Sequence, residues 1–284
     1  GIDELKADNS LDVDVRIGIS EEELLKDAGL YEAIIVRSQT KITEDVINEA
    51  AKLKIVGRAG VGVDNIAIPA ATKNGVIVMN TPAGNTISTA EHAFGLMASL
   101  ARNIPQAHAT VTGGGWGRKD YKGVELNKKT LAILGMGRIG TEFARRAIAF
   151  GMTVLAYDPY LSPSRAKTLQ VELFQDVDSI VAKADFITLH MPLTDETKHI
   201  INEERLKICK KGARIINCAR GGLIDENALL DSIESGHVAG AALDVYEESE
   251  PPPEGYALLK SKKIVFTPHL GASTAEAQEN VGIE

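Results

Sequence analysis

The stretch Leu131–Asp158, LAILGMGRIGTEFARRAIAFGMTVLAYD, indicates the fold most strongly. An apolar run leads into a G-x-G-x-x-G pattern at Gly135, Gly137 and Gly140, and a helical segment and a second apolar run then end on Asp158. The first glycine permits a tight turn, the second lets the backbone approach a pyrophosphate, and the third lets helix and strand pack closely. The stretch therefore predicts a strand, a glycine turn, a helix and a second strand that together bind a dinucleotide.

The same stretch predicts which dinucleotide is bound. A helix starting near Arg138 directs its N–H groups and positive dipole end at the phosphates. Asp158 stands about 20 residues beyond the last glycine, where a carboxylate accepts hydrogen bonds from the adenosine ribose. A 2′-phosphate about 4 Å from that carboxylate would cost about 4 kcal/mol per unit charge at an effective dielectric of about 20. We therefore expect NAD rather than NADP; the alternative is a glycine-rich turn that binds nothing.

The composition is that of an ordinary globular protein. The chain has 284 residues, of which 44% are hydrophobic and 25% charged, and its net charge is −8. We expect two domains, no nucleic-acid partner and no membrane-spanning segment. Cys209 and Cys218 lack metal-ligand spacing, so we expect no metal and a reducing, cytoplasmic location. An anionic substrate would need individually placed arginines against this acidic background.

Alternating apolar runs and amphipathic segments predict two α/β units with parallel sheets. The larger is a Rossmann-type, doubly wound sheet for the cofactor over residues 82–269, and the smaller is a flavodoxin-like substrate-binding domain over residues 1–81 and 270–284. Expected strands of the smaller unit are 13–19, 33–37, 54–58 and 76–79, with helices after a capping box at Ser20–Glu23 and at 43–51 and 66–74. Further strands of the larger unit are expected at 186–190, 213–218, 239–245 and 264–267, and a helix at 225–235.

The segment 86–100 reads as a long helix that is apolar around much of its circumference. Such a helix is buried on several sides. We expect it to lie between the domains or against a second copy of the chain.

Chemically active side chains follow two strands of the larger unit, and ligands bind at the carboxyl ends of parallel strands. Arg220, followed by two glycines, is placed to hold a carboxylate as a bidentate fork; the alternative is a surface arginine beside a turn. His269 can exchange a proton with an alcohol oxygen near neutral pH, although a lone histidine is more often structural. A carboxylate of the acidic stretch 247–250 could pair with it, unless that stretch is only a solvated loop.

The smaller unit also has cationic strand ends. Arg37 and Arg58 stand at such ends, and Gly60-Val61-Gly62 follows the second. Backbone N–H groups of a glycine-rich turn and two guanidinium groups can hold an anion. The alternative is that both arginines pair with neighbouring acids.

Between about residues 32 and 282 the chain resembles the D-2-hydroxyacid dehydrogenase family, and within it the phosphoglycerate dehydrogenase subgroup. The resemblance rests on Ile35-Val-Arg-Ser38, Gly57-Arg-Ala-Gly-Val-Gly-Val-Asp-Asn65, Met79-Asn-Thr-Pro82, Gly135–Gly140, Asn217-Cys-Ala-Arg-Gly-Gly222, Ala241-Ala-Leu-Asp-Val245 and Pro268-His-Leu-Gly-Ala-Ser-Thr274. It implies that both ends of the substrate domain continue beyond this chain.

The resemblance also implies a role for each of these residues. Arg220 binds the substrate carboxylate and polarises the C2 oxygen, His269 is the acid/base, and a glutamate pairs with it. Residues near the cofactor are Gly135, Gly137, Arg138, Ile139, Gly140, Asp158, His190, Pro192, Cys218, Ala219, Asp244 and Gly271, with Asp244 at the nicotinamide carboxamide. Substrate binding falls to Arg37, Ser38, Arg58, Val61 and Gly62, with the arginines at a phosphate.

The acidic turn Glu247–Pro251 is one residue longer than the family pattern. We expect Glu250, directly before the proline, to pair with the histidine, with Glu248 as the alternative. The implied reaction is NAD-dependent oxidation of D-3-phosphoglycerate to 3-phosphohydroxypyruvate in serine biosynthesis, by a homodimer or homotetramer formed through cofactor-domain helices. Alternatives are a glyoxylate/hydroxypyruvate reductase, another D-2-hydroxyacid dehydrogenase, or an NAD-sensing corepressor-like binding protein.

Overall fold

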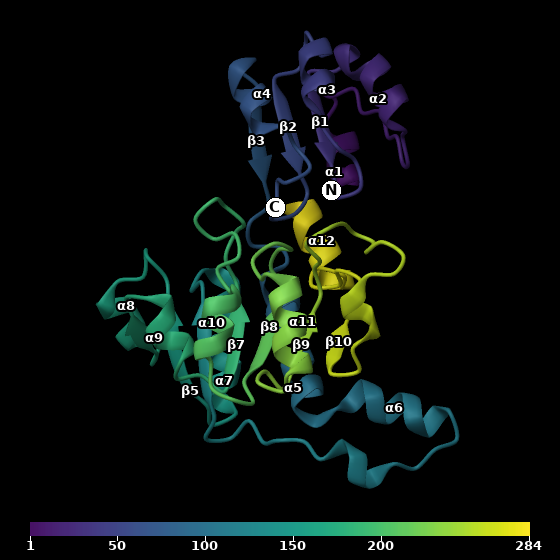
Figure 1. The fold of residues 1–284 in the computed structure, drawn as a ribbon. Helices are drawn as coiled ribbons and strands as arrows, with labels where there is room; N and C mark the ends of the chain where they lie inside the picture. Colours follow the sequence, from purple (N-terminus) through teal and green to yellow (C-terminus); the bar gives the residue numbers. More distant parts are fainter. The chain divides into compact units, whose positions relative to one another are not determined.

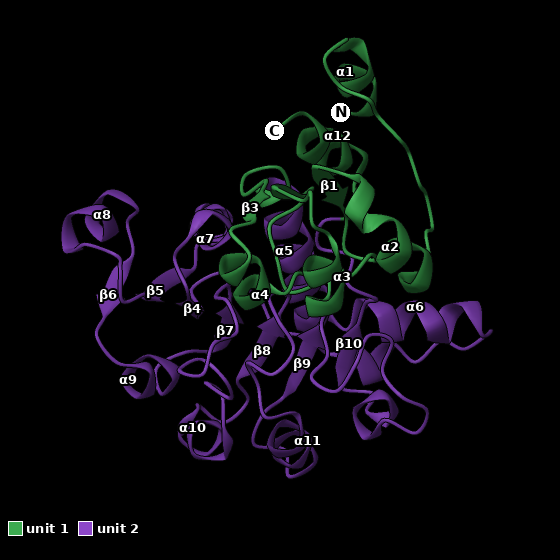
Figure 2. Cartoon of the chain, turned by 90° about the horizontal axis from the view of Figure 1, so that it is seen from above, with its two compact units in different colours: residues 1–86, 273–284 green, residues 87–272 purple.

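The computed structural model describes residues 1–284 and divides them into two compact units. Unit 1 comprises Gly1–Thr86 and Ser273–Glu284, and unit 2 comprises Ile87–Ala272 (Figure 1, Figure 2). The boundaries predicted from the sequence are at residues 81/82 and 269/270. Each unit is described by itself below.

Unit 2 is built on a sheet of seven strands, all parallel, in the order β10-β9-β8-β7-β4-β5-β6. The strands are β4 (Thr130–Leu134), β5 (Thr153–Tyr157), β6 (Glu172–Phe174), β7 (Phe186–Leu189), β8 (Arg214–Asn217), β9 (Gly240–Leu243) and β10 (Ile264–Phe266). The order reverses between β4 and β7, because the chain runs outward to β6 and then returns to the other side of β4. Ligands of doubly wound sheets bind outside the carboxyl ends of the strands at such a reversal. The predicted Rossmann-type architecture is confirmed.

Helices cover both faces of this sheet (Figure 2). Helices α9 (Val177–Val181), α10 (Glu203–Ile208) and α11 (Glu226–Glu234) pack on one face, and α5 (Thr86–Arg102), α7 (Arg138–Ala149) and α8 (Pro163–Thr168) pack on the other. Successive residues of β4 alternate between the two cores, with Leu131 on the α7 side and Ala132 on the α9 side. Burial of both faces explains why the strands read as continuous apolar runs.

Helix α5 packs into the core of unit 2 itself. Its residues Ala93, Met97 and Ala101 are fully buried and belong to the same cluster as Phe143 of α7. This packing accounts for much of the apolar surface of the helix. From the sequence, the helix was expected to lie between the domains or against a second copy of the chain. None of the helices combines the length and apolar composition that a bilayer-spanning helix needs.

Unit 1 contains a three-stranded parallel sheet in chain order. Its strands are β1 (Ala33–Val36), β2 (Ile55–Arg58) and β3 (Ile77–Asn80), and its helices are α1 (Ile2–Ala7), α2 (Glu21–Asp27), α3 (Glu44–Glu49), α4 (Ile68–Lys73) and α12 (Ala275–Ile283). Val36 and Val56 face a core that includes residues of α2, α3 and α4. Most of the remaining residues in the sheet are at least partly exposed.

One predicted helix start of unit 1 is confirmed and one predicted strand is wrong. The Ser20 hydroxyl accepts from the Glu23 N–H, and the Glu23 carboxylate accepts from the Ser20 N–H, which is the expected capping box. The segment 13–19 forms no strand, and Ile17 within it is 93% exposed. No neighbouring strand pairs with this segment, and an extended chain without a partner leaves its backbone groups to water.

Candidate active site

The glycine turn between β4 and α7 has the backbone geometry that the sequence pattern requires. Gly135 has φ +98°, and a Cβ there would lie 2.5 Å from the carbonyl oxygen of His190. A Cβ on Gly140 would lie 2.1 Å from the carbonyl oxygen of Gly135. By contrast, no atom lies within 4 Å of the Cβ position on Gly137. Two glycines thus permit close packing, and the third leaves the turn open where α7 begins.

Helix α7 presents an N-terminus suited to a phosphate group. It starts at Arg138, after Gly137 as the N-cap, and no side chain caps its first N–H groups. Arg138 is exposed and Ile139 is half-buried at this end. The free N–H groups of a twelve-residue helix and its positive dipole end fit a pyrophosphate.

Asp158 follows β5 and is tied to the glycine turn. Its Oδ2 accepts from the Met136 N–H at 2.7 Å, and its Oδ1 accepts from the Tyr160 N–H at 2.8 Å. The carboxylate thus fixes the turn. Contact with a cofactor ribose stays a prediction.

The residues after β7 and β8 form two further predicted parts of the cofactor site. The His190 ring lies 5.1 Å from that of Phe143, and burial lowers its pKa to about 3. The imidazole is therefore neutral at physiological pH and serves as a packing surface. Pro192 is exposed, whereas Cys218 is buried and Ala219 half-buried. Burial, together with the charge of Asp244, raises the pKa of the Cys218 thiol, which makes it a poor nucleophile.

Arg220 stands on a turn that its neighbours hold in place. The Asn217 side-chain amide donates to the Arg220 carbonyl oxygen at 2.8 Å and accepts from the Ala219 N–H at 3.0 Å. The guanidinium Nη1 donates to the Ala219 carbonyl oxygen at 2.7 Å. A Cβ on Gly221 would lie 1.8 Å from the Tyr246 carbonyl oxygen. The glycine after the arginine is therefore a packing requirement.

His269 is paired with Glu250. Its Nδ1 lies 2.5 Å from Oε2 of Glu250, and the two side chains are 49% and 36% exposed. The hydrogen bond to Glu250 raises the pKa of His269, while burial and the positive charge of Arg220 act in the opposite direction. Bonding at Nδ1 leaves Nε2 to face a substrate. Of the two glutamates considered from the sequence, the structure selects Glu250 rather than Glu248.

Asp244 holds the turn on which His269 stands. Its carboxylate, 0% exposed, accepts from the N–H groups of Leu270 and Gly271 at 2.8 and 2.9 Å. It also lies 2.5 Å from the Thr267 hydroxyl and 3.1 Å from Nε2 of His92. Burial would raise its pKa, but the bonds from His92, Thr267 and Leu270 outweigh burial and lower it. These contacts give Asp244 a positioning role, and its contact with a nicotinamide carboxamide stays a prediction.

His92 and Thr267 also belong to this network, and neither was predicted from the sequence. His92 lies on α5, far along the chain from Asp244, and no pattern in the sequence links the two. Thr267 directly follows β10 and precedes Pro268 and His269. This position at a strand end was the one feature of the sequence that could have indicated its role in the site. Gly271, predicted near the cofactor, is buried and bonded to Asp244.

The predicted substrate residues of unit 1 gather at the carboxyl ends of β1 and β2. Val36 and Arg58 are register partners, so Arg37 directly follows the residue opposite Arg58. Arg37 and Ser38 are exposed, and Arg58, Val61 and Gly62 are half-buried. A Cβ on Gly60 would lie 1.4 Å from Nη1 of Arg58, so glycine at this position makes room for the guanidinium. The Asn65 amide joins the two turns by donating to the Arg37 and Thr40 carbonyl oxygens.

Comparison with known proteins assigns the chain to a family. The model of the D-isomer specific 2-hydroxyacid dehydrogenase, NAD binding domain, matches residues 94–271. The chain belongs to this family. Within the D-2-hydroxyacid dehydrogenases, the D-3-phosphoglycerate dehydrogenase of Bacillus subtilis is 56% identical over 254 residues, which cover 89% of this chain and 48% of the relative.

The chain is also similar to a second curated relative and to a solved structure. The D-3-phosphoglycerate dehydrogenase of Methanocaldococcus jannaschii is 51% identical over 271 residues, 95% of this chain and 51% of the relative. The crystal structure of the TT0316 protein from Thermus thermophilus superposes with a TM-score of 0.87 and 33% identity, covering 99% of this chain and 90% of that one. The chain spans about half the length of the curated relatives it matches.

The NAD-binding assignment agrees with the residues of unit 2. The cradle closed by Gly135 and Gly140, the uncapped N-terminus of α7 and the carboxylate of Asp158 would hold the pyrophosphate and ribose of NAD. His190 and Ala219, at the ends of β7 and β8, would line the ring-binding part of the site. Arg220 and His269 follow β8 and β10 at the same edge of the sheet.

Proposed function

We propose that this chain carries out the NAD-dependent oxidation of D-3-phosphoglycerate to 3-phosphohydroxypyruvate, which leads to serine. The observation that carries this proposal is the pair of His269 with Glu250, together with Arg220, at the carboxyl edge of the NAD-binding sheet. An acid/base and a fixed cation at that edge suit the oxidation of a 2-hydroxy acid. Relatives that are about half identical and are named D-3-phosphoglycerate dehydrogenase support the choice of substrate.

In this proposal, each residue of the site has its own role in the reaction. His269 removes the proton of the C2 hydroxyl through Nε2 as the C2 hydride departs, and the resulting imidazolium is stabilised by the carboxylate of Glu250. Arg220 holds the substrate carboxylate and stabilises negative charge on the C2 oxygen. NAD supplies the hydride acceptor. A positioned base typically contributes about 10²–10⁴-fold in rate.

The substrate phosphate is assigned to unit 1. In this proposal Arg37 and Arg58 provide two positive charges, and the turn at Val61 and Gly62 provides backbone N–H groups. Their place at adjacent strand ends supports a shared anion site.

A panel of 2-hydroxy acids, followed by NADH absorbance, tests the substrate assignment. D-3-phosphoglycerate is expected to give the highest kcat/KM, above that of D-glycerate and D-lactate. The double substitution Arg37→Gln and Arg58→Gln should raise KM for phosphoglycerate much more than for D-glycerate. A preference for an unphosphorylated acid, or equal effects on both substrates, would exclude the phosphoglycerate assignment in favour of a hydroxypyruvate reductase.

A homodimer or homotetramer through helices of the NAD-binding unit is part of the proposal. Apolar side chains of α6 (Ile104–Thr112) and the loop after it are open to solvent, among them Ile104, Val111 and Trp116, the last of which is 82% exposed. Exposed apolar groups gathered on one element are typical of protein interfaces. The cytoplasmic location is also a proposal, supported by two cysteines that are both free.

A further inference from the structure

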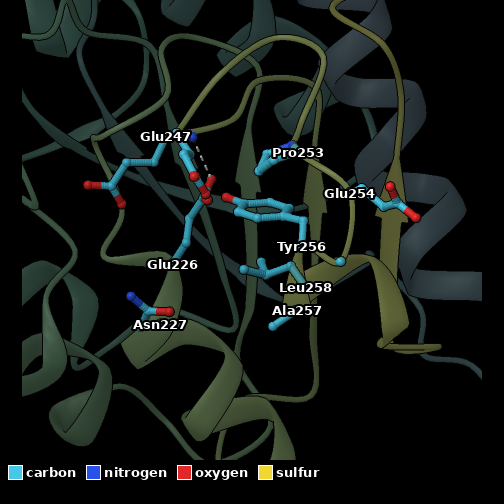
Figure 3. A pocket seen from close by; sticks show the side chains of 10 residues that line it. Glu226, Asn227, Glu247, Pro253, Glu254, Tyr256, Ala257 and Leu258 are labelled. Carbon is cyan, nitrogen blue, oxygen red and sulfur yellow. Dashed lines mark hydrogen bonds between the residues drawn. The ribbon is translucent and has the colours of Figure 1, made fainter.

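An acidic cavity lies beside the segment that carries Glu250, and the proposed reaction does not use it. It has a volume of about 570 Å³ and lies between the start of α11 and the segment Glu247–Leu258 (Figure 3). Four carboxylates line it, from Glu226, Glu247, Glu248 and Glu254, and no lysine or arginine does. The cavity thus offers negative charge with no lysine or arginine in its lining to neutralise it.

Glu226 is the feature of this cavity that points to a ligand. Its side chain is 5% exposed, and its Oε1 accepts from the Glu247 N–H at 3.2 Å. Its Oε2 is buried and has no hydrogen-bond partner, and the same holds for the hydroxyl of Tyr256. Figure 3 shows the Glu226 carboxyl group and the Tyr256 hydroxyl pointing toward one another. Because buried polar groups are nearly always hydrogen-bonded, two unpartnered groups in one cavity leave a place for a ligand that bonds to both.

The charge state of Glu226 fits a cationic partner. Burial raises the pKa of Glu226 to about 7, and the charges of Glu247 and Glu248 contribute in the same direction. Glu247 is itself bonded to His199, with 2.5 Å between Oε1 and Nε2. A buried carboxylate among other carboxylates is stabilised by a bound positive charge that also donates hydrogen bonds.

The size of the cavity and the arrangement of its polar side chains favour an organic cation over a metal ion. Cavities of about 300–1,000 Å³ are typical of small-molecule sites. No group of three or more His, Cys, Asp or Glu side chains in residues 1–284 is arranged to hold a metal ion. A primary ammonium group carries three donors and no acceptor, so it can donate both to the Glu226 carboxylate and to the oxygen of the Tyr256 hydroxyl.

We propose that this cavity binds a small organic cation through a primary ammonium group, which donates to Oε2 of Glu226 and to the Tyr256 hydroxyl. Glu248 and Glu254, which are exposed, add long-range attraction at the rim. Because Glu247 and Glu254 flank Glu250 in the chain, the bound cation restrains the segment that presents Glu250 to His269. The existence of this binding site does not depend on the proposed function. The effect of the bound cation on catalysis rests on the proposed function.

Isothermal titration calorimetry with 1,4-diaminobutane at about pH 8, where Glu226 is mostly ionised, tests the binding site. The protein should bind the diamine, and Glu226→Gln should weaken binding at least about tenfold. Glu234→Gln, on the exposed face of the same helix, should leave binding unchanged. Tetramethylammonium, which lacks N–H donors, should not bind.

Three results would overturn the proposal: no heat with the diamine, equal affinity in Glu226→Gln, or displacement of the diamine by equimolar Mg²⁺. Circular dichroism checks that Glu226→Gln is folded. If it is not folded, Tyr256→Phe, which removes only the hydroxyl, should weaken binding several-fold, and unchanged affinity there counts against the site equally.

Amide hydrogen exchange tests the restraint of the loop without using activity. Saturating diamine should slow exchange across residues 247–258 in the protein and in Glu234→Gln, but not in Glu226→Gln. Unchanged exchange in the protein with the diamine bound would overturn the link to Glu250. Neither measurement depends on the substrate, so a failure here is distinct from a failure of the proposed dehydrogenase reaction.

Discussion

At the scale of single residues, the surroundings of His269 suit the acid/base role proposed for it. Glu250 bonds its Nδ1, and Asp244 fixes the turn before and after it. Its backbone has φ +53°, a conformation that costs energy for a non-glycine residue and persists only where neighbours impose it. The hydrogen bonds that the N–H groups of Leu270 and Gly271 donate to Asp244 supply that constraint.

The first prediction concerns the pH dependence of the reaction. Because Glu250 raises the pKa of His269, oxidation, which needs neutral imidazole, should lose kcat/KM as pH falls through that raised pKa. Glu250→Gln removes the negative charge, so the pKa of His269 falls and the acidic limb should move to lower pH. The reduction direction, which needs imidazolium, should then lose activity at a lower pH than in the unchanged protein. Profiles of kcat/KM against pH in both directions measure this.

Glu248→Gln is the matched control, since Glu248 lies nearby but the structure pairs His269 with Glu250. Its profile should match that of the unchanged protein. An acidic limb that stays in place in Glu250→Gln, or that moves equally in Glu248→Gln, would contradict the assigned pair.

At the scale of elements, alanine substitutions at two glycines near the turn from β4 into α7 should have different effects, one on stability and the other on NAD binding. Gly140→Ala places a methyl group 2.1 Å from the Gly135 carbonyl oxygen, so helix and strand must separate, at a cost of about 1–3 kcal/mol. Gly137→Ala meets no atom within 4 Å and should keep its stability, while its methyl group stands at the open turn and weakens NAD binding. Urea unfolding and NADH fluorescence titration measure the two effects. A stable Gly140→Ala protein would contradict the packing role.

Elements whose signals are local could be predicted from the sequence. The Ser20–Glu23 capping box and the Asp225 N-cap of α11 bond within one turn, so the residues themselves specify them. The segment 13–19 alternates like a strand but forms none, because a strand depends on a neighbour that no local pattern reveals.

The same distinction holds for the site. Arg220, Glu250 and His269 could be found because each follows a strand or a recognisable turn. The bonds of His92 to Asp244 and of Asp158 to Met136 join distant segments, and only the folded chain shows them. In the sequence, Glu226 is an ordinary acidic residue in the first turn of a helix. Its burial could not be predicted from the sequence.

At the scale of the whole molecule, we expect the exposed apolar groups of α6 and its loop to mediate self-association. Trp116→Ser should shift the protein toward monomer, because a large aromatic side chain would leave the interface. Tyr160→Ser, which changes another highly exposed aromatic residue of unit 2, should leave the oligomeric state unchanged. Sedimentation velocity measures the oligomeric state of both variants. A Trp116→Ser protein that remains an oligomer would show that the interface lies elsewhere.

The most direct test of the account is the turnover of Arg220→Ala with D-3-phosphoglycerate and NAD. Arg220 is held at the end of β8 by Asn217, and it is not part of the glycine cradle that we expect to bind the dinucleotide. We predict a loss of at least about 10²–10³-fold in kcat, with NADH affinity unchanged in a fluorescence titration. Turnover equal to that of the unchanged protein would contradict the proposed chemistry.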